Sequence, residues 1–135
     1  MKKKLNRILL VDYDHEDCYF HQIVIDKMYI TDSVVEAKNG LEALDFLHKE
    51  GGPTPELIFL DINMPRMNGW EFLEEYKNLD PTRKARIVIM MLTTSANPDD
   101  LRKAKEIVDV TGFKTKPLSV EMLTEMLETY FPEYI

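Results

Sequence analysis

Four residues have side chains that could together carry out phosphoryl chemistry: Asp12, Asp61, Thr93 and Lys116. Each ends or directly follows a stretch that reads as a β-strand. A carboxylate can act as a nucleophile toward phosphorus. An ammonium group and a hydroxyl can neutralise and hold phosphoryl oxygens, and positioning with charge neutralisation is most of what phosphoryl transfer requires. These residue types could therefore serve phosphoryl transfer if the fold brings them together, but their spacing alone does not name the reaction.

Taken one at a time, the same residues have ordinary structural explanations. An aspartate after a strand often caps the next helix, and a single lysine is usually solvated. In an open parallel sheet, however, ligands bind outside the carboxyl ends of the strands. Two acids, a hydroxyl and an ammonium at that one edge favour a functional site. Two close carboxylates also repel each other, and a hard divalent cation would relieve this repulsion.

The elements that must position these residues alternate along the chain. We expect five strands, at Arg7–Asp12, Ser33–Ala37, Leu57–Asp61, Ile87–Leu92 and Asp109–Thr115. Helical spacing follows each strand: from Asp14, along Leu41–Leu47, along Phe72–Leu79, over Asp99–Val108, and after Ser119 to Tyr130. A glycine- and proline-rich loop is expected at 51–55.

Strands in which apolar residues are continuous, instead of alternating with polar ones, are typical of a parallel sheet covered on both faces. Five βα units therefore predict an α/β fold with right-handed crossovers. The length of 135 residues predicts one domain over 1–135, with a core at about 7–130 and no output domain.

Helical spacing also predicts which side chains face the core. On the first helix these are Phe20, Ile23, Val24 and Met28, and on the fourth Leu101, Ala104 and Val108. Pro81 is expected to stop the third helix and Ser119 to cap the last. His15 and His21 are expected at the surface or partly buried, without a ligand role.

Composition excludes several classes of protein. The net charge of −7 disfavours a nucleic-acid binder, which needs lysine and arginine against phosphates. The apolar runs are too short for a membrane span. A single cysteine excludes an internal disulfide and fits a reducing, cytoplasmic location. Three scattered histidines leave no spacing for a zinc site.

The run from Asp61 to Gly69, D-I-N-M-P-R-M-N-G, resembles the D-x-x-M-P-x-M-x-G loop of response-regulator receiver domains. Lys116-Pro117 and Thr93 stand at the matching strand ends. The resemblance covers about residues 7–130. It implies a flavodoxin-like, doubly wound five-stranded parallel sheet with strand order 2-1-3-4-5.

The resemblance also implies roles for the site residues. Asp61 would accept a phosphoryl group from a phosphohistidine on a histidine kinase or a histidine phosphotransfer protein. Asp12, Asp61 and the backbone carbonyl of Asn63 would hold Mg²⁺. Lys116 would pair with the acids and then with the phosphoryl group.

A second set of implied roles concerns the response to phosphorylation. Thr93 and Phe113 would form the switch, and the Lys116–Pro117 peptide bond would be cis. The face built from 99–108, 109–115 and the last helix would bind a downstream protein, with the chain a monomer or a weak homodimer through that face. Such a domain catalyses its own phosphorylation and dephosphorylation but is not an enzyme in the metabolic sense.

One position departs from the family pattern. The family usually has two adjacent acids after the first strand, whereas here Tyr13 follows Asp12, and a phenol with a pKa near 10 is a poor Mg²⁺ ligand. Either Asp14 takes the place of the missing acid or Asp12 ligates directly. Tyr13 also motivates an alternative, in which the receiver works as a binding or dimerisation module without phosphorylation.

Two further classes are disfavoured by particular residues. Haloacid-dehalogenase-like hydrolases usually carry a second acid two residues after the nucleophile, where this chain has Asn63. A flavin or nucleotide site needs a glycine-rich loop after the first strand, and the acidic run 12–17 would repel phosphate instead.

Overall fold

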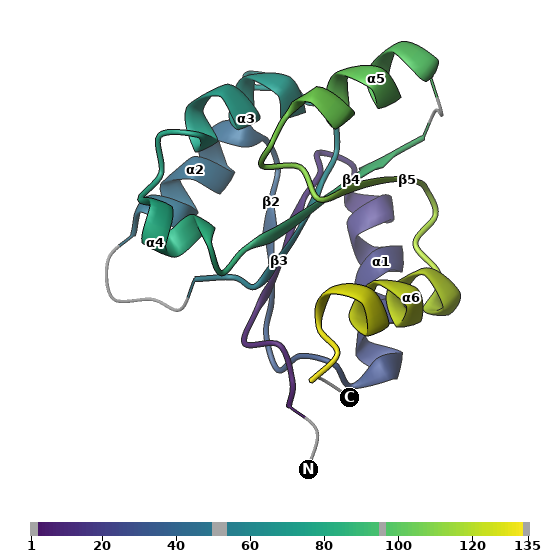
Figure 1. The fold of residues 1–135 in the computed structure, drawn as a ribbon. Helices are drawn as coiled ribbons and strands as arrows, with labels where there is room; N and C mark the ends of the chain where they lie inside the picture. Colours follow the sequence, from purple (N-terminus) through teal and green to yellow (C-terminus); the bar gives the residue numbers. More distant parts are fainter. Residues whose placement is uncertain (1–2, 50–53, 95–96, 134–135) are drawn as a thin grey trace.

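The sheet has the predicted parallel topology. The computed structural model describes residues 3–49, 54–94 and 97–133. Within these ranges, five parallel strands lie in the order β2-β1-β3-β4-β5 (Figure 1). The strands are β1 (Ile8–Val11), β2 (Val34–Ala37), β3 (Leu57–Leu60), β4 (Val88–Thr93) and β5 (Gly112–Thr115). The predicted strand order is therefore confirmed, although β5 begins three residues later than expected.

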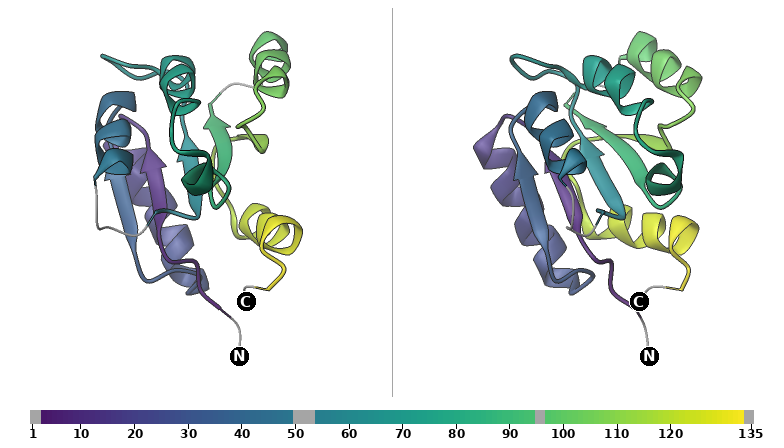
Figure 2. Two further views of the ribbon diagram at one scale, coloured as in Figure 1. Left: turned by 60° about the vertical axis from the view of Figure 1, so that its left-hand side comes forward. Right: turned by 90° about the vertical axis from the view of Figure 1, so that its left-hand side faces the viewer.

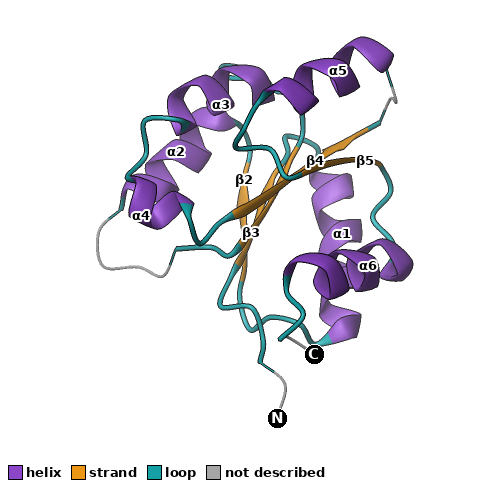
Figure 3. Cartoon of the chain, viewed as in Figure 1, coloured by secondary structure: helices purple, strands orange, loops and turns teal. Residues whose placement is uncertain are grey.

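Helices cover both faces of the sheet, as a doubly wound fold requires (Figures 2 and 3). They are α1 (His15–Met28), α2 (Gly40–His48), α3 (Gly69–Tyr76), α4 (Pro81–Lys84), α5 (Pro98–Glu106) and α6 (Val120–Tyr130). One apolar cluster joins the sheet to α1 and α6, and a second joins it to α2, α3 and α5. All four residues of β1 and of β3 are buried, which explains why these strands read as unbroken apolar runs.

Polar side chains fix where the helices begin. Ser119 accepts a hydrogen bond from the Met122 backbone N–H, which confirms the predicted cap of α6. Asn68 and Glu71 form a capping box at the start of α3. Asp80 caps α4, whose first residue is Pro81, so the proline expected to end α3 instead begins an additional one-turn helix.

The predicted inner face of α1 is partly wrong. Val24 is buried, but the other buried residues of this helix are Cys18, His21 and Ile25, while Phe20 is 46% exposed and Ile23 37%. Apolar side chains occur on two sides of α1, so spacing alone did not distinguish the side that meets the sheet. The expectation for His21 was also wrong, because its side chain is buried.

On α5 only one of the three predicted inward residues is buried. Ala104 packs in the core, whereas Leu101 is exposed and Val108 lies beyond the end of the helix and is 96% exposed. The predicted loop at 51–55 lies mostly outside the described residues. In the described part of the chain, none of the helices has the length and apolar character needed to cross a bilayer.

Candidate functional site

Parallel pairing brings the four candidate residues to one edge of the sheet. The backbone N–H of Asp61 donates to the Val11 carbonyl at 2.9 Å, which sets the end of β3 beside the end of β1. The N–H of Lys116 donates to the Thr93 carbonyl at 2.6 Å, which does the same for β5 and β4. The register of the strands thus assembles side chains that are about 100 residues apart in the sequence.

The ammonium group of Lys116 lies at the centre of this edge. Its Nζ is 2.6 Å from Asp12 Oδ2, 2.8 Å from Asp17 Oδ2 and 3.6 Å from Asp61 Oδ2. The lysine side chain is only 7% exposed. A buried ammonium is stable only with partners of opposite charge, and three carboxylates supply them.

Burial and charge set the protonation of the two central groups. The pKa of Asp61 is raised to about 6, chiefly by burial and also by the negative charge of Asp12, while Lys116 acts in the opposite direction. Burial alone would lower the pKa of Lys116. Hydrogen bonds to Asp12 and Asp17 outweigh this and hold that pKa above its usual range. At neutral pH the site therefore combines an ionised Asp61 with a charged lysine.

The carboxylate of Asp14 is engaged in hydrogen bonds with the first turn of α1. Its Oδ1 accepts hydrogen bonds from the backbone N–H groups of Glu16 and Asp17, at 2.9 and 3.1 Å. Its own N–H donates to Asp12 Oδ1 at 2.9 Å. Tyr13 is 58% exposed. The structure thus places Asp14 as the N-cap of α1 and leaves the phenol of Tyr13 largely in solvent.

Asp17 is a site residue that the sequence analysis missed. It was noted only as one acid of the run 12–17. With Asp14 as N-cap, Asp17 is the third residue of α1, and its carboxylate reaches the ammonium of Lys116. The spacing of one helical turn between the cap and a second acid places Asp17 in the first turn of α1, but it does not show that the side chain reaches the sheet edge.

The loop after Asp61 depends on a close backbone approach at Gly69. The Gly69 N–H donates to the Ile62 carbonyl at 2.8 Å. A Cβ added to Gly69 would lie 2.4 Å from the Asp61 carbonyl oxygen and 3.1 Å from Ile62 Cα. Only glycine fits here without a backbone shift, which explains physically why the nine-residue run ends in this residue.

The predicted switch residues lie on neighbouring strands. Thr93, at the end of β4, is buried and pairs in register with Thr115, while Phe113 pairs with Met91 two residues earlier. Phe113 is half-buried and packs on the core cluster that contains α3 and Ala104 of α5. The Lys116–Pro117 peptide bond is cis.

A small cavity lies directly beneath the carboxylates. Its volume of about 10 Å³ is the space of about one water molecule. Asp12, His21 and Asp61 line it together with apolar side chains of β1, β3 and β4. Burial lowers the pKa of His21, and the charge of Lys116 lowers it further, so that this histidine is neutral at pH 7.

The oxygen atoms at this edge are of the type that Mg²⁺ prefers as ligands. Asp12, Asp61 and the carbonyl of Asn63 offer oxygen ligands, and Mg²⁺ commonly takes only one or two carboxylates and keeps several waters. Among the described residues, no group of three or more histidine, cysteine, aspartate or glutamate side chains is arranged to hold a metal ion.

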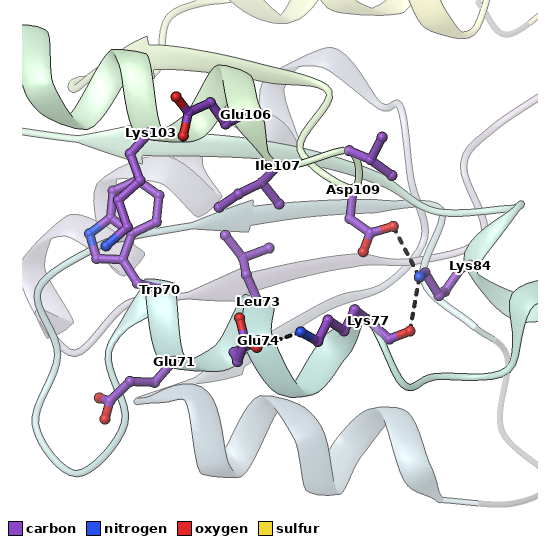
Figure 4. Close-up of a pocket in the computed structure, with 11 residues that line it drawn as sticks. Trp70, Glu71, Leu73, Glu74, Lys77, Lys84, Lys103, Glu106, Ile107 and Asp109 are labelled. Atoms are coloured by element: carbon purple, nitrogen blue, oxygen red, sulfur yellow. Dashed lines mark hydrogen bonds and ion pairs between the residues drawn. The ribbon is translucent and has the colours of Figure 1, made fainter.

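A much larger groove of about 710 Å³ lies elsewhere, between α3 and α5 (Figure 4). Leu73 and Ile107 form its apolar wall, and the Lys103 ammonium lies 4.6 Å from the centre of the Trp70 ring. Lys84 pairs with Asp109 at its rim. None of the four candidate residues lines this groove.

Comparison with known proteins identifies what this arrangement resembles. Residues 8–128 match the family described as the response regulator receiver domain. Response regulator Rcp1 of Synechocystis sp. is 35% identical over 125 residues, covering 90% of this chain and 83% of that protein.

Solved structures agree with this match. A two-component response regulator from Cytophaga hutchinsonii superposes with a TM-score of 0.89 at 26% identity, covering 97% of this chain and all of the other. The Mn²⁺-bound form of Rcp1 superposes with a TM-score of 0.73 at 34% identity, over 96% of each chain.

Proposed function

Because this chain belongs to the response-regulator receiver family of two-component signal transduction, we propose that Asp61 is the residue that accepts the phosphoryl group. The observation that carries this assignment is the position of its carboxylate, 3.6 Å from the Lys116 ammonium at the carboxyl edge of the sheet. Members of this family are in general phosphoacceptor switches that exchange phosphoryl groups with histidine kinases or phosphotransfer proteins.

In the proposed reaction an oxygen of ionised Asp61 attacks the phosphorus of a phosphohistidine. The P–O bond forms as the P–N bond breaks, and the imidazole leaves with the electron pair and takes up a proton. Lys116 neutralises charge on the transferred group, and the Thr93 hydroxyl donates to one of its oxygens. Asp12, Asp61 and the Asn63 carbonyl are the proposed Mg²⁺ ligands, and a bound cation would offset the negative charge collected there.

In the proposed response to phosphorylation, the structural change passes from the site through residues of β4 and β5. A phosphoryl group on Asp61 would draw Thr93 toward it and let Phe113 follow, which changes the face made by α5, β5 and α6. This is a two-state equilibrium biased by the new contacts of the phosphoryl oxygens. The same face is the proposed docking site for a downstream protein.

A small phosphodonor tests the acceptor directly. Incubation with acetyl phosphate and Mg²⁺ should add one phosphoryl group to the wild type and none to Asp61→Asn, as read by intact mass. A second candidate, a receiver that works without phosphate, is favoured by the exposure of Tyr13 and the capping role of Asp14. It predicts no mass gain in the wild type at any donor concentration.

A further inference from the structure

We propose that Asp17 is a positioning residue: it holds the ammonium of Lys116 in its resting place and competes for it with a phosphoryl group on Asp61. The inference rests on the proposed function and adds a residue that sets how readily the site is phosphorylated. Its basis is the geometry of the ammonium group, which forms hydrogen bonds to Asp12 and Asp17 and only a longer ion pair with Asp61.

The fold fixes where Asp17 can act. Asp14 caps α1 through the N–H groups of residues 16 and 17, so the first turn of the helix has a defined orientation at the sheet edge. The Asp17 carboxylate reaches the site from this turn, and its side chain is 35% exposed, whereas those of Asp12 and Asp61 are 8% and 13% exposed. Asp17 is thus the outermost of the three carboxylates around the ammonium.

The charges explain why Asp17 and a phosphoryl group on Asp61 would compete for the Lys116 ammonium. Three carboxylates surround one ammonium, so Lys116 cannot move toward a phosphoryl group without weakening its hydrogen bonds to Asp12 or Asp17. The bond to Asp17 stabilises the unphosphorylated state more than the phosphorylated one. A group that favours one state shifts the equilibrium by its differential interaction with the two states. The Asp17 charge also repels an incoming anionic donor.

The test compares four proteins: wild type, Asp17→Asn, Asp17→Glu and Glu16→Gln. Glu16 is the matched control, because it is an acid in the same first turn of α1 but contributes no contact to Lys116. The phosphorylated fraction is measured by intact mass with limiting acetyl phosphate and saturating Mg²⁺. Exchange of the Lys116 ammonium hydrogens with water is measured by ¹⁵N NMR without a donor.

We expect Asp17→Asn to raise the phosphorylated fraction by about two- to fivefold. This is the effect expected from the loss of one partly exposed ion pair. It should also speed up exchange of the Lys116 ammonium hydrogens. Asp17→Glu should keep most of the wild-type behaviour, and Glu16→Gln should match the wild type in both measurements. Circular dichroism and urea unfolding of the two neutralised variants control for loss of α1.

Any of four results would overturn the inference. Three of them are equal phosphorylation of Asp17→Asn and Glu16→Gln, a lower phosphorylated fraction in Asp17→Asn, and unchanged ammonium exchange. A higher Mg²⁺ requirement confined to Asp17→Asn would also overturn it, because Asp17 would then be a cation ligand. If the wild type takes no phosphoryl group, the proposed function fails, while ammonium exchange still decides whether Asp17 anchors Lys116.

Discussion

Lys116 Nζ lies 3.6 Å from Asp61 Oδ2, close enough for an ion pair but longer than a charge-assisted hydrogen bond. Lys116, whose pKa is raised, is charged. It lies near the proposed nucleophile without forming a short hydrogen bond to it. This relationship requires both the parallel order of the strands and the two other acids that hold the lysine.

Lys116→Met should lower both stability and phosphorylation. It leaves the three carboxylates without their common cation, and breaking a buried ion pair costs about 3 kcal/mol of the free energy of unfolding. The rate of phosphorylation should fall by about a hundredfold, the usual effect of removing one electrostatic stabiliser. Urea unfolding and intact mass measure the two effects. Lys105→Met, on the exposed side of α5, should change neither, and a similar loss in that variant would contradict the assignment.

Stability of the metal-free protein should depend on pH through Asp61. Folding raises the pKa of this carboxyl from 3.8 to about 6, so the folded state binds the proton more tightly than the unfolded state. Asp61 therefore destabilises the fold as the pH rises from about 4 to 6, by about 2–3 kcal/mol once the carboxyl is fully ionised.

Asp61→Asn should accordingly stabilise the protein at pH 7, and this gain should shrink as the pH falls toward 4. Urea unfolding in EDTA at several pH values measures the difference. Asp45→Asn, at an exposed position of α2, is the control. A gain that stays constant across this pH range would show that desolvation of Asp61 is not its source.

Gly69→Ala should disturb the loop that follows Asp61, the proposed phosphoacceptor. The added methyl group would lie 2.4 Å from the Asp61 carbonyl oxygen, so the backbone must move, and overpacking of this kind costs about 1–3 kcal/mol. Gly112→Ala is a matched control, because its methyl group would meet only the flexible end of the Met90 side chain. We expect lower stability and weaker phosphorylation for Gly69→Ala alone. Equal effects at both glycines would contradict the role of the close approach.

Trp70 should report movement of α5. It is the single tryptophan of the chain, and the Lys103 ammonium of α5 lies over its ring. If phosphorylation shifts α5, the contact changes, and the emission spectrum of Trp70 should change with it. Lys103→Met should alter the spectrum of the unphosphorylated protein. A spectrum that is identical before and after phosphorylation, confirmed by mass, would argue against a shift of α5 at this contact.

The strand ends and the parallel α/β class were predictable because both follow from local patterns, whereas the strand order was implied only by the resemblance to receiver domains. Unbroken apolar runs such as Leu57–Leu60 mark buried parallel strands, and the next residue then stands at the ligand-binding edge. The role of Asp17 was not predictable in this way, because it depends on the orientation of α1 and on a lysine 99 residues away. The direction of a side chain at the start of a helix depends on how that helix packs in the folded domain.

The errors on α1 and α4 have separate physical causes. Phe20 and His21 are neighbours on α1, and the sheet buries the histidine rather than the phenylalanine, which spacing of apolar residues cannot anticipate. Before α4, the pair Asp80-Pro81 carried a valid helix-start signal, an N-cap followed by proline at the first helical position. Because Pro81 also follows the apolar spacing of the preceding helix, it equally fits a helix end, and only the structure distinguishes the two.

The most direct test of the central claim is the intact mass of the wild type and of Asp61→Asn after incubation with acetyl phosphate, with and without Mg²⁺. We predict one added phosphoryl group on the wild type in the presence of Mg²⁺ and none on Asp61→Asn. An equal gain in both proteins would show that another residue is the acceptor. No gain in the folded wild type at any donor concentration would contradict phosphorylation as the switch.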